Sequence, residues 1–199
     1  MKTEKGYLET AEKNLKQAYK IINELQIQET WQKYGITAHL IGSVPTGLLM
    51  KNRDIDFHVY SDQFSIVDSF KAIAELATNP QVKRITYTNL LDTEEKCLEW
   101  HMWYLDDKND EWQIDMIHIL KGSFYAGRME EVARRINEVL TPETKEAILS
   151  IKNEVPADEK VMGIEIYMAV IRDGIRNYHA FTEWKKAQIN DQPIIDWIP

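Results

Sequence analysis

Two aspartates separated by one residue, Asp54 and Asp56, open an apolar run and constrain this 199-residue chain more than any other feature. The run reads DIDFHVYS, and its alternation of polar and apolar residues predicts a half-buried β-strand. Alternate side chains of a strand point to one face, roughly 6.6–6.8 Å apart along the chain, so both carboxylates should lie side by side while Ile55 and Phe57 enter the core. Adjacent carboxylates repel each other and resist burial unless a cation lies between them. The pattern therefore predicts a site for one or two ions such as Mg²⁺, which prefers oxygen ligands.

A Gly-Ser pair, Gly42 and Ser43, lies at the end of an earlier apolar segment, ITAHLIG, which predicts a second buried strand. Backbone N–H groups exposed where a strand turns into a helix, together with a serine hydroxyl, can bind an anion. Each motif alone has an ordinary interpretation: Gly-Ser as a simple turn, and the two aspartates as a strand end that faces water. Their succession over a short stretch of chain favours a combined metal and phosphate site.

A third acid, Asp115, interrupts another apolar run, EWQIDMIHIL, between Ile114 and Met116. A lone carboxylate in such a strand is costly to bury unless it has a partner. It is therefore expected either to bind a metal ion or to accept a buried hydrogen bond, and an edge strand with Asp115 facing solvent is the alternative.

The arrangement of periodic segments predicts an α+β fold. An amphipathic helix is expected over residues 7–34, with a break near Gln26, and a second helix over residues 63–78. Besides the two strands above, three more are expected over residues 82–90, 97–105 and 112–119, the last two joined by a hairpin turn. After Tyr125 helical spacing covers residues 127–140, 141–155 and 159–187, and the tail, residues 190–199, is expected to be an irregular strap. The chain therefore divides into an α/β part, residues 1–122, and a helical part, residues 123–199.

The segment IGSVPTGLLMKNRDIDFHV resembles the signature of the DNA polymerase beta-like nucleotidyltransferase superfamily: an apolar residue, Gly-Ser, about ten residues, then Asp-apolar-Asp-apolar. Asp115 in IDMI resembles the third carboxylate of that superfamily. The order of elements over residues 36–119 is similar to its palm-like core, a mixed sheet flanked by helices. The helical part resembles the bundle appended in small-molecule members such as aminoglycoside and lincosamide nucleotidyltransferases.

The resemblance implies a Mg²⁺-dependent enzyme that transfers a nucleoside monophosphate from a nucleoside triphosphate, with ATP as the expected donor, to a hydroxyl group of a small molecule. It implies that Asp54 and Asp56 hold two Mg²⁺ ions, that Asp115 completes the second metal site and favours deprotonation of the acceptor, and that Gly42 and Ser43 bind the terminal phosphates.

One position departs from the pattern of many members, because Thr46 stands where an arginine often binds phosphate. Lys51 or Arg53, on the loop before the acidic strand, could replace that charge. Two alternatives to the small-molecule enzyme therefore remain. One is a non-catalytic nucleotide-binding or regulatory module of the same fold, and the other is a protein AMPylator or antitoxin-type nucleotidyltransferase.

The charge and composition narrow the classes of partner. The net charge is −8 and no basic run occurs, which argues against a grip on long nucleic acid, since such a grip depends on phosphate neutralisation. No apolar run approaches the roughly 20 residues that span a bilayer, so no membrane partner is expected. The single cysteine, Cys97, cannot form an internal disulfide, and a reducing cytoplasm is the expected location.

Overall fold

A five-stranded mixed sheet organises the protein, seen in a computed structural model that describes residues 4–188 and 197–199. Its strand order is β1-β2-β5-β4-β3; β2 and β5 run parallel and the other neighbours are antiparallel. The strands are β1 (Thr37–Ile41), β2 (Asp54–Ser61), β3 (Val82–Asn89), β4 (Leu98–Leu105) and β5 (Glu111–Leu120). The helices are α1 (Glu4–Leu25), α2 (Ile27–Lys33), α3 (Ser43–Thr46), α4 (Ile66–Leu76), α5 (Arg128–Val139), α6 (Pro142–Glu154), α7 (Gly163–Ile171) and α8 (Tyr178–Ala187). The predicted α+β class and the mixed sheet flanked by helices are confirmed.

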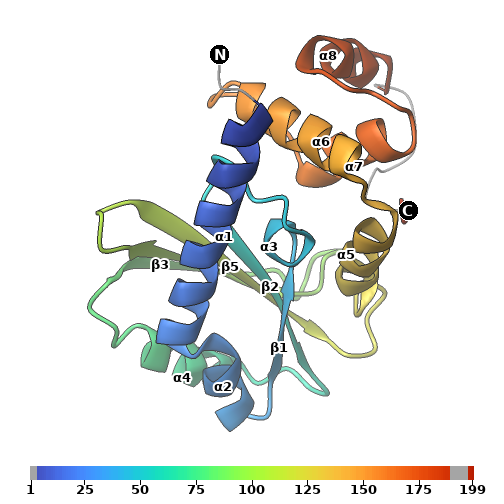
Figure 1. Cartoon of the computed structure of the whole chain (residues 1–199). Coiled ribbons are helices and arrows are strands. Elements are labelled where there is room, and N and C mark those ends of the chain that lie inside the picture. The colour runs from blue at the N-terminus through green and yellow to red at the C-terminus, as the bar shows by residue number, and fades with distance from the viewer. Residues whose placement is uncertain (1–3, 189–196) are drawn as a thin grey trace.

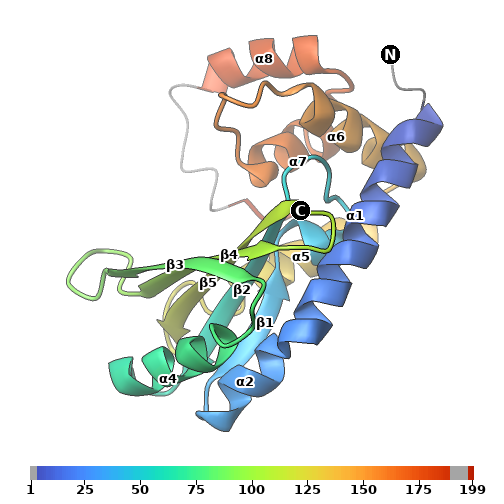
Figure 2. The same ribbon diagram turned by 90° about the vertical axis from the view of Figure 1, so that its left-hand side faces the viewer.

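One face of the sheet packs against α1, α2 and α4, as Figures 1 and 2 show from two sides. Ile55 and Phe57 of β2 point into this core and are fully buried, as the alternation predicts. The main core consists of alternate strand residues and the apolar stripes of the three helices, with Trp31 and Trp100 among its largest fully buried side chains. The same alternation turns the acidic side chains of β2 to the opposite face.

The break predicted in the first helix is real. Gln26 adopts a left-handed conformation (φ 49°, ψ 46°) between α1 and α2, which bends the chain so that both helices lie on the sheet. In the C-terminal part, by contrast, the sequence has helical spacing without a break from residue 159 to 187, but the structure is not helical between α7 and α8. The chain leaves α7 after Ile171, turns at Gly174 with φ 72°, and begins α8 only at Tyr178.

A second apolar core lies among helices α5 to α8. It also includes Ala11 of α1 and two buried residues of the loop before β2, Leu48 and Met50. The helical part is thus packed on the N-terminal part through this loop, and Figure 1 shows α6 and α7 beyond the end of the sheet near α3. The division into domains at residue 122 stays a prediction. None of the helices described is long and apolar enough to cross a membrane.

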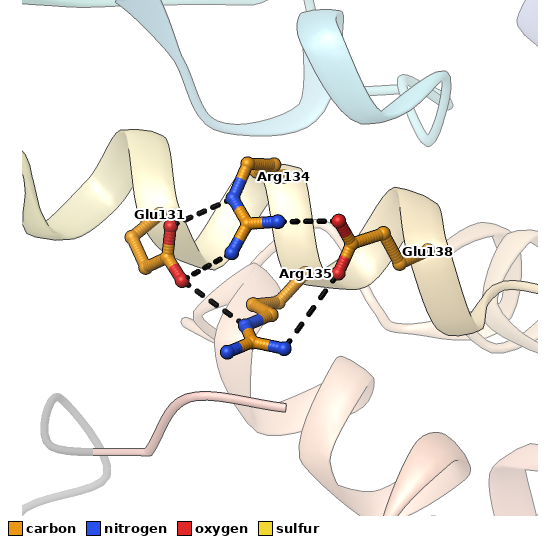
Figure 3. A network of polar contacts seen from close by, with 4 residues as sticks. All are labelled: Glu131, Arg134, Arg135 and Glu138. Carbon is orange, nitrogen blue, oxygen red and sulfur yellow. Dashed lines mark hydrogen bonds and ion pairs between the residues drawn. The ribbon is translucent and has the colours of Figure 1, made fainter.

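Helix α5 is amphipathic, with one charged, exposed face and one apolar, buried face. Its outer face holds an ion-pair network in which Arg134 and Arg135 each contact both Glu131 and Glu138 (Figure 3). Hydrogen bonds from Arg134, assisted by Arg135, lower the pKa of Glu131 to about 2. The opposite face is apolar, with its buried residues Val132, Ala133 and Ile136, and it forms the wall of the cavity described next.

The outermost strand, β3, has an irregularity: its register against β4 shifts between Val82 and Arg84. Most of its side chains are exposed, in agreement with its position at the edge of the sheet.

Candidate active site

The register of two parallel strands brings the three predicted carboxylates together. β2 and β5 pair Asp56 with Asp115 and place Asp54 opposite Gln113. Neighbouring strands lie about 4.8 Å apart, so side chains on the same face of such a pair meet. Asp54, Asp56 and Asp115 all line one cavity of about 400 Å³, whose other walls include Gly42 and the apolar face of α5. The sequence predicted the acids but not the strand pairing that gathers them.

The carboxylate of Asp56 is buried and lies close to two other negative charges. Burial, followed by the negative charges of Asp54 and Asp115, raises the pKa of Asp56 to about 8, while the positive charge of Lys152 acts in the opposite sense. Near neutral pH, Asp56 therefore retains a proton when no cation is bound. A divalent cation can replace that proton, because it neutralises the repulsion that burial strengthens.

The carboxylate oxygens are suitable ligands for Mg²⁺, although the three acids do not surround one common position. In the described part of the chain, no group of three or more His, Cys, Asp or Glu side chains is arranged as a ready-made metal site. Mg²⁺ usually takes only one or two protein carboxylates and fills its shell with water and substrate phosphate oxygens. An open set of carboxylates facing a cavity fits this ion and is suited to binding it together with a phosphate ligand.

Asp115 is held in place by two neighbours that the sequence interpretation missed. Nδ1 of His101 lies 2.6 Å from Oδ1 of Asp115, and the side-chain amide of Gln113 donates to both carboxylate oxygens at 2.9 and 3.1 Å. These contacts satisfy the partly buried carboxylate. The signal was present in the β4–β5 hairpin, since counting outward from its turn places His101 opposite Asp115.

The Gly-Ser turn adjoins Asp56 directly. Gly42 has φ 73° and ψ −141° and precedes the short helix α3, whose first residue is the buried Ser43. Gly42 occupies the N-cap position of this helix, which has no side-chain capping hydrogen bond. Thr46 directs its hydroxyl back to the carbonyl oxygens of Gly42 and Ser43, at 3.2 and 3.1 Å. It rigidifies the turn and offers no positive charge to a phosphate.

Gly42→Ala is expected to destabilise the protein by about 2 kcal/mol, because a Cβ atom there would lie 2.2 Å from Oδ2 of Asp56 on a left-handed backbone. Urea denaturation measures the change in the free energy of unfolding. Gly122→Ala is the matched control, since a Cβ atom there meets no atom within 4 Å. Equal stability of the two variants would contradict the close contact between the turn and Asp56.

The two cations expected to bind nucleotide are engaged elsewhere. The amine of Lys51 donates to the carbonyl oxygens of Asn153, at 3.2 Å, and Val155, at the end of α6. The guanidinium of Arg53 pairs with Asp110 at 2.9 Å, on the β4–β5 hairpin. Both residues line cavities that also contain Asp54, Lys51 the larger and Arg53 a smaller one, so their nucleotide-binding role stays a prediction.

The helical part supplies a lysine, Lys152, whose positive charge acts on Asp56. Lys152 of α6 donates to the carbonyl oxygen of Leu48 and to the hydroxyl of Tyr167, each at 2.9 Å. It lines a cavity of about 600 Å³ together with Ser43 and Asp54, between the end of the sheet and the segment that joins α6 to α7. No local motif marks Lys152, because the fold brings it to the acids from a distant part of the chain.

Comparison with known proteins identifies the fold. No protein-family model matches the chain, and no curated protein matches its sequence. A solved structure of the Cid1 poly(U) polymerase with MgGTP bound is similar, with a TM-score of 0.58 and 13% identity over 79% of this chain. GLD-2 is similar in its complex with RNP-8 (TM-score 0.56, 10% identity, 98% of this chain and 75% of that chain). It is also similar in the poly(A) polymerase complex GLD-2–GLD-3 (TM-score 0.54, 10% identity, 96% of this chain and 67% of that chain).

The chain spans about half of the Cid1 structure, 49% of its length. At these identities the likeness concerns the fold, and it agrees with the resemblance carried by the Gly-Ser and Asp-x-Asp segment. The protein therefore has the nucleotidyltransferase fold of these polymerases.

Proposed function

We propose that this protein is a divalent-metal-dependent nucleotidyltransferase that transfers a nucleoside monophosphate from a nucleoside triphosphate, ATP being the expected donor, to an acceptor hydroxyl. The observation behind the proposal is the convergence of Asp54, Asp56 and Asp115 on one cavity beside the Gly42 turn, within the fold of known nucleotide-adding polymerases. The MgGTP in the Cid1 structure supports a magnesium–nucleotide donor here.

The reaction needs one bond made and one broken. The acceptor oxygen attacks the α-phosphorus, the bond from that phosphorus to the bridging oxygen of the β-phosphate breaks, and pyrophosphate leaves with the bonding electrons. The hydroxyl proton passes to Asp115, which His101 and Gln113 hold in position, and from there to water. Two Mg²⁺ ions held by Asp54 and Asp56, one of them shared with Asp115, would polarise the attacking and leaving oxygens.

The triphosphate fits beside α3. Gly42 and Ser43 present their backbone to it, and Lys152 supplies the positive charge that Thr46 lacks. The base and ribose then occupy the cavity of about 600 Å³ that Ser43, Asp54 and Lys152 line. A cavity of this size suits a nucleotide.

The acceptor is a small molecule in this proposal. The net charge of −8 and the acidic surroundings of the site disfavour a polyanion. An RNA end is the second candidate, because the similar proteins are described as poly(U) and poly(A) polymerases. The experiments below distinguish the two.

Lys152→Met is expected to weaken binding of MgATP about tenfold, the usual worth of one charge-assisted hydrogen bond to phosphate. Isothermal titration of ATP, GTP, CTP and UTP with Mg²⁺ measures it, and circular dichroism checks that the fold survives the loss of the bonds to Leu48 and Tyr167. Lys186→Met, which changes an exposed lysine of α8, is the matched control.

Affinity of Lys152→Met within twofold of wild type would remove Lys152 from the nucleotide site. Absence of Mg²⁺-dependent binding of every triphosphate to folded wild-type protein would overturn the proposed function itself.

A further inference from the structure

The polar face of the sheet continues beyond the carboxylates. The register aligns Asp54 of β2, Gln113 of β5, Trp103 of β4 and Arg84 of β3 in one row across four strands. Since side chains in one row point to the same face, Trp103 and Arg84 stand on the side that holds the acids. The proposed chemistry assigns no role to either residue.

Trp103 and Arg84 form a stack. The guanidinium carbon of Arg84 lies 3.5 Å from the centre of the Trp103 ring, a close cation–π contact. Trp103 is half-buried and lines a separate cavity of about 330 Å³, whereas Arg84 does not line it. The arginine therefore covers the indole ring from outside the cavity, and Trp103 contributes other atoms to the cavity wall. The cavity is also lined by Asp54, Asp115, Gln113, Glu111 and Arg53.

The position of this cavity matches the direction of the proposed reaction. In an in-line displacement the attacking oxygen and the leaving pyrophosphate lie on opposite sides of the phosphorus. The phosphate-binding turn follows β1, the metal-binding acids lie on β2 and β5, and Trp103 lies on β4, in that order across the sheet. A donor whose pyrophosphate is at the β1 side leaves the β4 side for the acceptor.

We infer that Trp103, backed by Arg84, is the acceptor-binding platform of this enzyme, and that the acceptor is a phosphate-free, nucleoside-sized molecule whose planar ring stacks on the indole while its hydroxyl reaches Asp115. The inference rests on the proposed nucleotidyl transfer and names the class of acceptor. Stacking on an aromatic side chain tolerates any flat ring, because each ring presents a π face.

The charges around the cavity exclude a phosphorylated acceptor. Asp54, Asp115 and Glu111 line it, and Arg53, the one cation lining it in the described part of the chain, is already paired with Asp110 at 2.9 Å. Arg84 is occupied by the indole ring. In the proposed Mg²⁺ complex the charges of Asp54 and Asp115 are balanced by the ions, so an acceptor phosphate would face Glu111 and would find no unpaired cation among the described lining residues, unlike the RNA ends that suit basic channels.

The test uses the full chain saturated with Mg²⁺ and α,β-methylene-ATP, which fills the donor site and cannot transfer. Adenosine, guanosine, cytidine and uridine are titrated by calorimetry, with their 5′-monophosphates, glucose and a hexauridylate RNA as comparisons. At least one nucleoside is expected to bind, its 5′-monophosphate at least tenfold more weakly. Its addition should shift the indole N–H resonance of Trp103, identified by its absence in Trp103→Phe.

Trp103→Ala is expected to weaken that nucleoside at least tenfold, as loss of one stacking surface typically does, and Trp103→Phe to weaken it less than threefold. Tyr19→Ala, which removes an exposed aromatic ring from α1, should change nothing. Affinity for α,β-methylene-ATP should stay within twofold of wild type in all variants. Tighter binding of the hexauridylate or of the monophosphates, binding of glucose alone, or no bound ring compound while the donor analogue binds would each overturn the inference. Failure of the donor analogue itself would instead refute the proposed function.

Discussion

Asp54→Asn and Asp115→Asn are each expected to lower the rate of nucleotidyl transfer by at least about 1,000-fold, the scale of loss when a metal- or charge-stabilising group of an active site is removed. The two variants should differ in which kinetic parameters they change. Asp54 lines both the cavity proposed for the nucleotide and the cavity that the three carboxylates share, so its loss should also weaken MgATP binding. Asp115 lines the cavity proposed for the acceptor and not the one proposed for the nucleotide, so its loss should lower kcat while KM for ATP stays within about threefold.

Pyrophosphate release from MgATP, with and without the nucleosides named above, measures both effects. Asp62→Asn is the matched control, because Asp62 follows β2 directly but its side chain is 81% exposed and pairs with Lys121 at the surface. Rates within tenfold of wild type for Asp54→Asn or Asp115→Asn would show that these carboxylates do not hold the reacting groups. That result would favour a non-catalytic nucleotide-binding module.

Asp56→Asn is expected to stabilise the metal-free protein while removing the proposed Mg²⁺ site. The pKa of Asp56 lies near 8 in the folded protein, against 3.8 for an ordinary aspartate. Below pH 3.8 the carboxyl is neutral in both folded and unfolded chains, and the substitution should change little. As the pH rises toward 8, the unfolded chain ionises freely and the folded chain does so at a cost, so wild-type stability falls relative to Asp56→Asn.

The gap in the free energy of unfolding should therefore open between about pH 4 and pH 8 and level off above. A pKa change of this size sets an upper limit of roughly 6 kcal/mol, and relaxation of the site reduces the expected gain at pH 8 to about 2 kcal/mol. Urea denaturation across this pH range, in EDTA and in Mg²⁺ at about 10 mM, measures this gap in the free energy of unfolding. Mg²⁺ should stabilise wild type alone, by mass action, and so narrow the gap. A gap that is constant with pH would contradict the burial of a proton at Asp56.

The local parts of the site could be predicted from the sequence. Period-two alternation identified β2 and turned Asp54 and Asp56 away from Ile55 and Phe57, because strand geometry fixes the side-chain direction within a single segment. The helix break near Gln26 was equally local.

What depended on pairing or on distant segments was missed. Nothing in the β2 segment reveals that β5 lies beside it in parallel, although this pairing brings Asp115 to Asp56. Lys51 and Arg53 were plausible as phosphate ligands by proximity in sequence, yet their charges are attracted to the end of α6 and to Asp110. Lys152 reaches the acids only because α6 packs against the loop that contains Leu48, and long-range packing of this kind leaves no short motif.

The irregular outer strand bears on how the protein behaves at high concentration. An exposed sheet edge is a template to which a strand of another molecule can add, which is a common first step in aggregation. On β3 the register shift at Val82–Arg84 interrupts the row of backbone groups, and Lys83 and Arg84 place like charges where two such edges would meet. The same arginine that backs the Trp103 indole thus also protects the sheet from growing by strand addition, and its removal would expose an aromatic ring and a template together.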